Sequence, residues 1–452
     1  MSTPPPPDAR ALAYDILKMP DRAGFVNDRL EAALRSTGLD GQPRRLATEL
    51  VYGVTRRRAT LDALLRPCCS RPKQNVEPDL WTLLRLGTYQ LAFLTGVATH
   101  AAVHETVELA KRAGKPQWTG FANAILRKVS ALVLDDGMSM PAADAFPHPE
   151  GGFRLVRDKI FPDPDADPIA YFAEAFSLPG WLVSRWAERF DEDELTEIAR
   201  HFDGPPALTL RSRVGERDAL LEEIRDAGHK AVAGDHPQAI RLRGHAPVES
   251  LPGFSAGRFA VQDETAITAA TTLDPPRGGR VLDMCAAPGT KATHLAELVG
   301  PEGTVVATDV HAGRLAMIGE GAARLGLGNV QPVHVDADGV GTPPGPYDAI
   351  LLDAPCSNTG VLGRRPDARW RLRPDDLAEL PRLQERLLRR ALDLLAPSGK
   401  LLYSTCSIEP EENEDVLKNA VAGRDDRVVT RSQTFRPGAS GDGGFQALIG
   451  PA

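Results

Sequence analysis

The chain has 452 residues, enough for two to four domains of ordinary size. Its 42% hydrophobic and 25% charged residues are typical of a soluble globular protein, and no apolar run is long enough to cross a bilayer. A net charge of −8 argues against a general basic nucleic-acid coat protein. The start, MSTPPPPDAR, lacks the apolar segment of a signal peptide, so we expect a cytoplasmic protein.

The N-terminal region, residues 9–130, shows helical periodicity throughout. Apolar residues recur at helical spacing in several stretches, among them Ala11, Leu12, Ile16 and Leu17, then Leu46, Leu50, Val51 and Val54, and then Leu83, Leu84 and Leu86. The pattern predicts an all-α bundle. Basic residues crowd part of it, namely Arg44, Arg45, Arg56, Arg57, Arg58, Arg66, Arg71 and Lys73. Two interpretations stay open for this cluster: a solvated helix face, or a row of exposed arginines that follows an RNA backbone.

Residues 131–170 break the helical pattern. The stretches PAADAFPHPEGG and FPDPDADP are rich in Pro, Gly and Asp, which favours a linker or insertion over packed structure. Periodicity resumes in residues 171–262, first as a helix and then as a strand at 207–212, a helix at 216–228 and a strand at 239–243. This order predicts a small α+β middle domain with the proportions of an RNA-binding module.

The C-terminal part, residues 263–452, alternates strands and helices, which indicates a parallel, doubly wound sheet with crossover helices. The predicted strands are 280–283, 304–308, 330–335, 347–352 and 399–405. Helices are expected to begin near 291, 311, 376 and 411. Two further strands, 427–431 and 444–449, would complete a seven-stranded Rossmann-like sheet with an antiparallel edge.

The first strand of this sheet leads into a distinctive turn, RVLDMCAAPGTK at 280–291. Small residues follow the strand and a helix opens at Thr290, an arrangement that lets a nucleotide-sized ligand approach the backbone. The stretch has neither the G-x-G-x-x-G spacing of a dinucleotide site nor the spacing of a phosphate-binding loop. We therefore expect a cofactor other than NAD or ATP.

Acidic residues follow successive strands at the edge where parallel sheets bind ligands, namely Asp283, Asp309, Asp336 and Asp353. A carboxylate after the second strand is placed to accept hydrogen bonds from ribose hydroxyls, so Asp309 is the candidate for that contact. Asp338 competes with Asp336 for the position after the third strand. The spacing from Leu325 and Gly326 favours Asp336.

Two cysteines follow neighbouring strands as well: Cys356 after the fourth and Cys406 after the fifth. One buried cysteine is usually a small apolar residue, but two at adjacent strand ends favour chemistry. The stretch Ser407–Glu412 predicts a helix start that would favour a Cys406 thiolate, and Glu409, Glu411 and Glu412 would oppose it if they point inward. Cys285 is expected to pack in the turn. The five cysteines form no C-x-x-C pair, so we expect reduced thiols and no metal.

These motifs together resemble the Sun family of RNA cytosine-5 methyltransferases. The resemblance rests on DMCAAPGTK at 283–291, DAPCS at 353–357, and TCS at 405–407 followed by PEEN at 410–413. The stretch VQDE at 261–264 resembles the family's entry into the catalytic domain. ATELVYGV at 47–54 and LGTYQL at 86–91 resemble the NusB-like RNA-binding domain of the bacterial 16S ribosomal RNA enzymes.

The resemblance implies S-adenosylmethionine as the cofactor. It places the turn around the methionine part, that is Cys285, Ala286, Ala287, Pro288, Gly289, Thr290 and Lys291. It also places Asp309 on the ribose, Asp336 near the adenine and Asp353 at the methyl-transfer site. In the family the cysteine of the Thr-Cys motif is the nucleophile and that of the Pro-Cys motif assists product release. These roles fall on Cys406 and Cys356.

The expected function is transfer of a methyl group to carbon 5 of a cytosine in 16S ribosomal RNA, as part of rRNA processing. A transfer RNA cytosine-5 methyltransferase is the alternative enzyme, and a non-catalytic RNA-binding assembly factor is the alternative of another class. The NusB-like region favours ribosomal RNA. We expect RNA as the partner, a monomer, and no membrane. The target cytosine, and whether the substrate is naked RNA or a pre-ribosomal particle, stay open.

Overall fold

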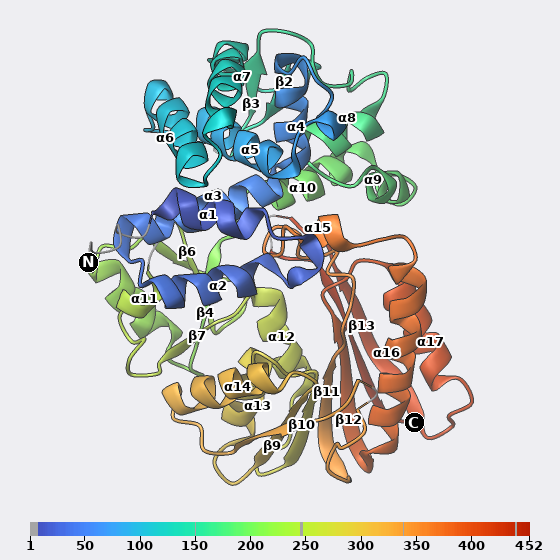
Figure 1. Ribbon diagram of the computed structural model, residues 1–452. Coiled ribbons are helices and arrows are strands. Elements are labelled where there is room, and N and C mark those ends of the chain that lie inside the picture. The colour runs from blue at the N-terminus through green and yellow to red at the C-terminus, as the bar shows by residue number, and fades with distance from the viewer. Residues whose placement is uncertain (1–7, 150, 245–246, 338, 439–440) are drawn as a thin grey trace. The chain divides into compact units, whose positions relative to one another are not determined.

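The computed structural model describes residues 8–149, 151–244, 247–337, 339–438 and 441–452 (Figure 1). Its contacts divide the chain into two units. Unit 1 runs to Pro205 and also takes in Leu362–Leu372, which we call the return segment. Unit 2 comprises Pro206–Val361 and Arg373–Ala452. Among the described residues, no helix is long and apolar enough to cross a membrane.

Unit 1 begins with the predicted all-α bundle. Its helices are α1 Ala9–Leu17, α2 Val26–Thr37, α3 Gly41–Arg56, α4 Arg58–Leu65, α5 Pro78–Ala92, α6 Thr99–Arg112 and α7 Thr119–Leu132. Short 3-10 turns lie between them at Asp21–Ala23 (η1), Arg66–Cys68 (η2), Lys73–Asn75 (η3) and Pro116–Trp118 (η4). The Asp8 side chain caps the first turn of α1, and Gly38, in the left-handed conformation, ends α2. Gly53 lets α3 pack closely on α5, because a Cβ there would overlap the ring of Tyr89.

The described part of residues 131–170 contains a packed sheet, so the expectation of a linker or insertion without packed structure is wrong. These residues form an antiparallel sheet of order β1-β3-β2 from β1 Val133–Met138, β2 Ala145–Pro147 and β3 Phe153–Val156. Apolar side chains, including Phe146 and Phe153, form the buried side of this sheet. Pro147 is tolerated because β2 is an edge strand. The helices α8 Pro168–Ala175, α9 Gly180–Ala187 and α10 Glu192–Asp203 also belong to unit 1, whereas the predicted middle domain began at residue 171.

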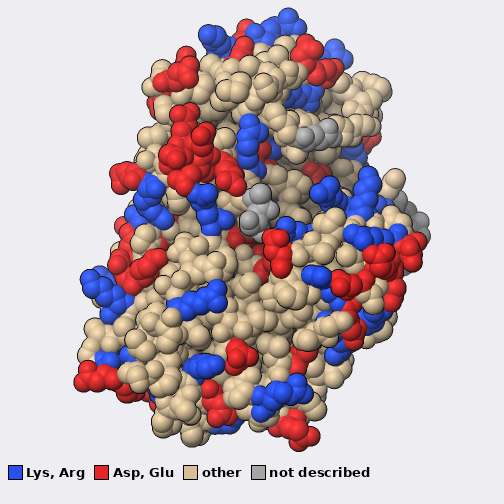
Figure 2. All heavy atoms as spheres, turned by 180° about the vertical axis from the view of Figure 1, so that it is seen from behind, with Lys and Arg blue, Asp and Glu red and all other residues tan. Residues whose placement is uncertain are grey.

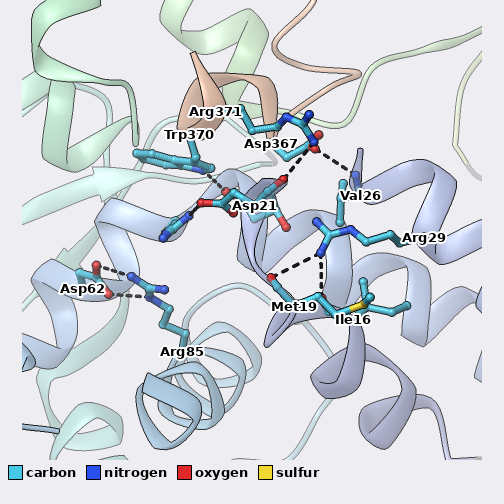
Figure 3. Close-up of polar contacts among 12 residues, drawn as sticks. Ile16, Met19, Asp21, Val26, Arg29, Asp62, Arg85, Asp367, Trp370 and Arg371 are labelled. Atoms are coloured by element: carbon cyan, nitrogen blue, oxygen red, sulfur yellow. Dashed lines mark hydrogen bonds and ion pairs between the residues drawn. The ribbon is translucent and has the colours of Figure 1, made fainter. Parts of the chain in front are cut away.

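The return segment, which contains α15 Ala368–Arg371, is fixed within unit 1 by side chains that bond to backbone groups. Arg369 is buried and donates to the carbonyls of Ser177, Phe202 and Leu362 at 2.9–3.1 Å. Figure 3 shows two further contacts of this segment, Val26 N to Asp367 and Arg371 to the Asp21 carbonyl. Trp370 Nε1 also donates to the Thr55 carbonyl. The chain therefore leaves unit 2 after Val361 and re-enters it at Arg373.

The N-terminal basic cluster does not form one exposed row. Arg57 is 2% exposed and pairs with Asp203 at 2.6 Å, and Arg56 is also buried, with its guanidinium donating to the Gly363 carbonyl. Arg44 and Arg45 are exposed. On the face in Figure 2, basic and acidic side chains are interspersed. The interpretation of the cluster as an RNA-binding row is therefore wrong for Arg56 and Arg57, which hold unit 1 together.

Unit 2 begins with the predicted small α+β element. A four-stranded sheet of order β5-β6-β4-β7 is formed by β4 Leu208–Ser212, β5 Ala231–Ala233, β6 Ala239–Leu242 and β7 Phe259–Val261. The helix α11 Arg217–Asp226 covers it through Leu220, Leu221 and Ile224, and η5 Val248–Ser250 lies before β7. The strands at 207–212 and 239–243 and the helix between them are confirmed.

The second sheet of unit 2 is the predicted seven-stranded one. Its strands are β8 Arg280–Met284, β9 Thr304–Asp309, β10 Val330–His334, β11 Tyr347–Asp353, β12 Leu395–Thr405, β13 Arg427–Phe435 and β14 Gly444–Pro451. The order is β10-β9-β8-β11-β12-β14-β13; β14 pairs antiparallel with both β12 and β13, and the other neighbours are parallel. The Rossmann-like architecture with an antiparallel edge is thereby confirmed.

Helices cover both faces of this sheet (Figure 1). On one side lie α12 Glu264–Leu273, α13 Thr290–Val299 and α14 Ala312–Arg324, and on the other lie α16 Asp376–Asp393 and α17 Glu414–Val421, with η6 Pro410–Glu412 before α17. Neighbouring residues of β8 illustrate the two layers, because Val281 packs with α13 and Leu282 packs with α16. This double cover explains why the strands read as continuous apolar runs.

Candidate active site

The carboxyl ends of the central parallel strands lie side by side at one edge of the seven-stranded sheet. Asp309 ends β9, Asp353 ends β11, and Asp283 lies one residue before the end of β8. Cys406 directly follows β12, and Asp353 is level with Ser404 in the parallel register. The structure thus brings together three of the four predicted strand-end acids and the second cysteine, at the edge where such sheets bind ligands.

The turn between β8 and α13 has an unusual backbone made from small residues. Cys285 adopts φ +60° and Gly289, which precedes the first residue of α13, adopts φ +102°. A Cβ on Gly289 would lie 2.9 Å from the Cα of Ile318, so only glycine fits without a shift. Burial raises the pKa of the Cys285 thiol well above its ordinary value, so Cys285 stays protonated and lines the turn.

Asp309 is held rigidly beside this turn. One carboxylate oxygen accepts from the backbone N–H of Ala287 at 3.1 Å, and the other accepts from that of His311 at 2.9 Å. Each oxygen has two lone pairs, so the carboxylate keeps acceptor capacity for hydroxyl groups of a ligand.

A lysine and two further acids lie under the same edge. Lys291 Nζ is 2.7 Å from Asp353. Burial lowers the pKa of Lys291, but the charge and hydrogen bond of Asp353 together with the neighbouring Cys406 and Asp283 outweigh that effect, so the pKa is raised and the lysine stays charged. Asp283 is completely buried, and its carboxylate oxygens have no hydrogen-bond partner among the described residues. Burial, together with the charge of Asp353, raises the pKa of Asp283 well above its ordinary value, which favours a neutral acid.

Asp336 is exposed and hydrogen-bonds to its own loop. It follows β10 by two residues, and its carboxylate accepts from the Val340 N–H at 2.7 Å. Asp338, the competing candidate, lies outside the described residues.

The two candidate cysteines are in direct contact. Cys356 Sγ lies 3.2 Å from Cys406 Sγ, and Cys406 Sγ lies 3.2 Å from Asn358 Oδ1. Asn358 adopts the left-handed conformation, with φ +64°, and its Nδ2 donates to the Cys356 carbonyl at 2.8 Å. The hydrogen bond with Cys406, together with burial, raises the pKa of Cys356 well above its ordinary value. Cys356 is therefore the protonated donor if Cys406 ionises.

Glu412 has a place that the sequence reasoning missed. It points inward, as that reasoning allowed, but it bonds to both cysteine loops. Its carboxylate accepts from the hydroxyls of Ser357 and Ser407, from the Ser357 N–H at 2.8 Å and from Gln384 Nε2 at 3.0 Å. Burial raises the pKa of Glu412, and its hydrogen-bond donors oppose that effect. The available signal was the position of PEEN, which begins three residues after the end of TCS.

Arg211 is a second residue that the sequence reasoning missed. It lies on β4 of the four-stranded sheet, is 2% exposed, and donates to the Thr290 carbonyl at 2.7 Å. A second nitrogen lies 3.3 Å from Thr293 Oγ1. Within unit 2, the four-stranded sheet is thus bonded to the first turn of α13. No spacing pattern connects two positions 79 residues apart.

Three parts of the chain match known protein families. Residues 270–446 match the 16S rRNA methyltransferase RsmB/F family, residues 7–131 match the NusB family, and residues 178–249 match a ferredoxin-like domain of RsmF/B-like methyltransferases. A probable ribosomal RNA small subunit methyltransferase B from Bacillus subtilis is 34% identical over 89% of this chain and 85% of its own length. A Synechocystis protein of the same description is 35% identical over 94% and 91%.

The chain belongs to the RsmB/F family of 16S rRNA methyltransferases. As a member of it, the chain is an S-adenosylmethionine-dependent rRNA methyltransferase with an N-terminal NusB domain and a ferredoxin-like middle domain.

Solved structures share the fold of this family member. The crystal structure of PH0851 has a TM-score of 0.76 at 22% identity and covers 100% of this chain and 99% of its own. A methyltransferase homolog protein from Pyrococcus horikoshii has a TM-score of 0.56 at 26% identity, over 63% of this chain and 99% of its own.

The strand-end residues of this methyltransferase fit S-adenosylmethionine. Gly289 lets the β8–α13 turn pack closely against Ile318, and Asp309 offers a fixed carboxylate beside this turn. The charged pair of Lys291 and Asp353 is only partly covered, with side chains 16% and 32% exposed. A nucleoside with ribose hydroxyls and a charged amino-acid part therefore finds matching polar groups on one edge.

Proposed function

We propose that this chain methylates carbon 5 of a cytosine in 16S ribosomal RNA through a covalent bond between Cys406 and carbon 6 of that base. The observation that carries the proposal is the pair of cysteines, 3.2 Å apart, on neighbouring loops at the edge of the sheet that carries the cofactor turn. The sheet order supports it, because β11 lies between β8, which leads into the turn, and β12.

Cys406 supplies the nucleophile. Carbon 5 of cytosine is weakly nucleophilic while the ring is aromatic. When Cys406 Sγ bonds to carbon 6, the double bond between carbons 5 and 6 breaks, and carbon 5 gains the character of an enamine carbon. S-adenosylmethionine, when bound, supplies the electrophilic methyl group that carbon 5 takes up. Cys356 stabilises the ionised Cys406 by donating its thiol hydrogen bond across the 3.2 Å contact.

Cys356 assists the release of the product. After methylation, the proton on carbon 5 must leave, its electron pair must re-form the double bond, and the bond between carbon 6 and sulfur must break. The electron pair of that bond returns to Cys406. Once Cys406 is bonded to carbon 6 it carries no negative charge, so it no longer raises the pKa of Cys356. Cys356 then gives its thiol proton to solvent, and its thiolate accepts the carbon 5 proton.

The remaining predicted residues would hold the cofactor and the RNA. Residues Cys285–Lys291 would surround the methionine part, Asp309 would bind the ribose, Asp336 would lie toward the adenine, and Asp353 would lie at the methyl-transfer position. We propose that the all-α region, residues 9–130, and the α+β region within 171–262 bind RNA, while residues 263–452 perform the reaction. The cytosine must be unstacked or single-stranded to reach the cysteines.

Nucleoside analysis tests this proposal. The full-length chain is incubated with 16S ribosomal RNA, with transfer RNA, and with small pre-ribosomal particles, each in the presence of S-adenosylmethionine. Mass spectrometry of the digested RNA then identifies the methylated nucleoside, and bisulfite sequencing locates it. We expect 5-methylcytidine in the ribosomal RNA. A methyl group on another base would overturn the proposed chemistry, and modification of transfer RNA alone would favour the transfer RNA enzyme.

A further inference from the structure

One buried carboxylate connects the two cysteine loops. Glu412 is 0% exposed, and the residues that bond to it come from three separate parts of unit 2. Ser357 follows Cys356, Ser407 follows Cys406, and Gln384 lies on α16. Each cysteine is thus followed directly by a serine whose hydroxyl donates to the same carboxylate.

The loops are also bonded to one another around this carboxylate. The Gly360 N–H donates to the Cys406 carbonyl at 3.0 Å, and the Ser357 and Ser407 hydroxyls lie 3.1 Å apart. Thr359 Oγ1 accepts from the Ile408 N–H at 3.1 Å. These contacts involve backbone groups and hydroxyls and no charged group. Thr359 Oγ1 also lies 3.4 Å from the Ser357 hydroxyl and 3.2 Å from the Ser407 hydroxyl. Glu412 differs from it in that its carboxylate is acceptor-only and also accepts from the Ser357 N–H and from Gln384.

A carboxylate is a costly way to fill this space if packing is its only purpose. Burying an ionised group away from water costs several kcal/mol unless donors compensate. Among the described residues, four donors converge on the Glu412 carboxylate, and none of these four is a basic side chain. An apolar side chain would leave the Ser357 N–H and one N–H of Gln384 without this acceptor, although Gln384 also donates to the Pro355 carbonyl at 2.9 Å. The donor set therefore fits a carboxylate whose purpose is to fix the two loops in one geometry.

We infer that Glu412 is a positioning residue that sets the distance between Cys356 and Cys406 through Ser357 and Ser407. The inference rests on the proposed function, because it assigns a step to each cysteine. The adduct forms at Cys406 and its release depends on Cys356, so one carboxylate governs both half-reactions. Errors of about 1 Å in the placement of reacting groups lower rates by about 100-fold.

Cutting one connection at a time separates the two half-reactions. Ser407→Ala removes the hydroxyl bond on the Cys406 side and leaves the Ser357 side intact, so adduct formation slows. Ser357→Ala acts on the Cys356 side, so the adduct forms but is released slowly and accumulates. Glu412→Gln keeps the shape of the side chain but replaces one acceptor by a donor that faces N–H and hydroxyl groups, so both steps slow.

The experiment measures single-turnover methylation of 16S ribosomal RNA by the full-length chain, with the protein–RNA adduct followed on denaturing gels. We expect Glu412→Gln to lower kcat about 10- to 100-fold while the KM for RNA changes by less than about twofold. The control is Glu414→Gln, an exposed acid two residues further along, which should leave kcat unchanged. Calorimetric titration with S-adenosylmethionine, together with thermal melting, checks that each variant is folded.

Two results would overturn the inference. One is a native kcat for folded Glu412→Gln. The other is a pair of serine variants that lose activity equally and with the same ratio of adduct to product, since a purely structural role predicts that outcome. Cys406→Ala, measured in parallel, separates this inference from the proposed function. If Cys406→Ala is inactive and Glu412→Gln is fully active, only the role of Glu412 fails, whereas an active Cys406→Ala removes the covalent mechanism itself.

Discussion

Cys356 Sγ and Cys406 Sγ lie 3.2 Å apart although 50 residues separate them in the chain. Their proximity follows from the sheet, because β11 and β12 are parallel neighbours whose carboxyl ends are level, with Asp353 beside Ser404. Each loop that leaves these ends carries one cysteine. The fold thus places two thiols in contact at the edge of the sheet where the β8–α13 turn begins.

The conformation of Gly289 predicts how the cofactor site responds to a single methyl group. Gly289→Ala would introduce a left-handed alanine whose Cβ lies 2.9 Å from the Ile318 backbone, so the turn must shift. Strain of about 1–2 kcal/mol predicts a rise of about tenfold in the Kd for S-adenosylmethionine. Isothermal titration calorimetry measures it. Gly313→Ala, at a helical glycine whose Cβ would meet open space, is the control, and equal Kd values for both variants would contradict the prediction.

Because Arg57 and Asp203 form a buried ion pair, removing Arg57 should lower the free energy of unfolding, whereas removing an exposed arginine should not. Arg57→Ala leaves a buried carboxylate without its nearest cation, which typically costs about 3 kcal/mol or more. Arg44→Ala removes an exposed charge and should change the free energy of unfolding by less than about 0.5 kcal/mol. All five tryptophans lie in unit 1, so fluorescence during denaturant unfolding reports on this unit. Equal midpoints for the two variants would show that the ion pair is unimportant.

Asp203 also predicts a pH dependence. Burial raises the pKa of Asp203 to about 6 despite the three arginines around it, whereas the pKa in the unfolded chain is about 3.9. A raised pKa means that the folded state binds the proton more tightly. The associated stability is therefore present below about pH 4 and is lost as the pH rises through about 6.

Denaturant titrations of the wild type and of Asp203→Asn at several pH values measure this effect. The free energy of unfolding of the wild type, relative to that of the variant, should fall by up to about 3 kcal/mol between pH 4 and pH 7. The contributions of all other titrating groups cancel in this difference, because both proteins contain the same groups. A difference that stays constant over this range would contradict the raised pKa.

Sequence patterns predicted the elements of unit 2 well because its strands are short apolar runs separated by helices. The Val281 and Leu282 positions, for instance, are both apolar because each faces a helical layer. Strand ends then locate Asp309, Cys356 and Cys406 without knowledge of the fold. Local spacing and side-chain type were sufficient for these residues.

Other features depend on contacts that no local pattern carries. The return segment joins unit 1 because Arg369 reaches carbonyls at Ser177 and Phe202, far away in sequence. Arg57 reads as an exposed cation until Asp203 is placed beside it. The sequence left open whether Glu412 points inward. Its buried position depends on contacts with Ser357 and Ser407, which come from two different loops. In each case a charged side chain is buried because distant partners compensate it.

The raised pKa and the position of Cys356 predict a trapped intermediate. Cys356→Ala retains the nucleophile but lacks the group that assists release, so the adduct with RNA should accumulate in the presence of S-adenosylmethionine. Denaturing gel electrophoresis detects the adduct as a protein band of reduced mobility. Digestion of the RNA with nuclease should return this band to the mobility of the free protein. Turnover should fall by about 100-fold or more, on the scale of removing a proton-transfer group. Free product at the native rate would remove Cys356 from the mechanism.

Trapping with a substrate analogue tests the covalent role of Cys406 most directly. RNA with 5-fluorocytosine at the target position blocks release. Carbon 5 of this base carries fluorine in place of the hydrogen that must leave as a proton. The wild-type chain should form a stable adduct with this RNA and S-adenosylmethionine, and peptide mapping should place the base on Cys406. Cys406→Ser should form no adduct and no methylated product. A crosslink to another residue, or methylation by Cys406→Ser at the native rate, would contradict the account.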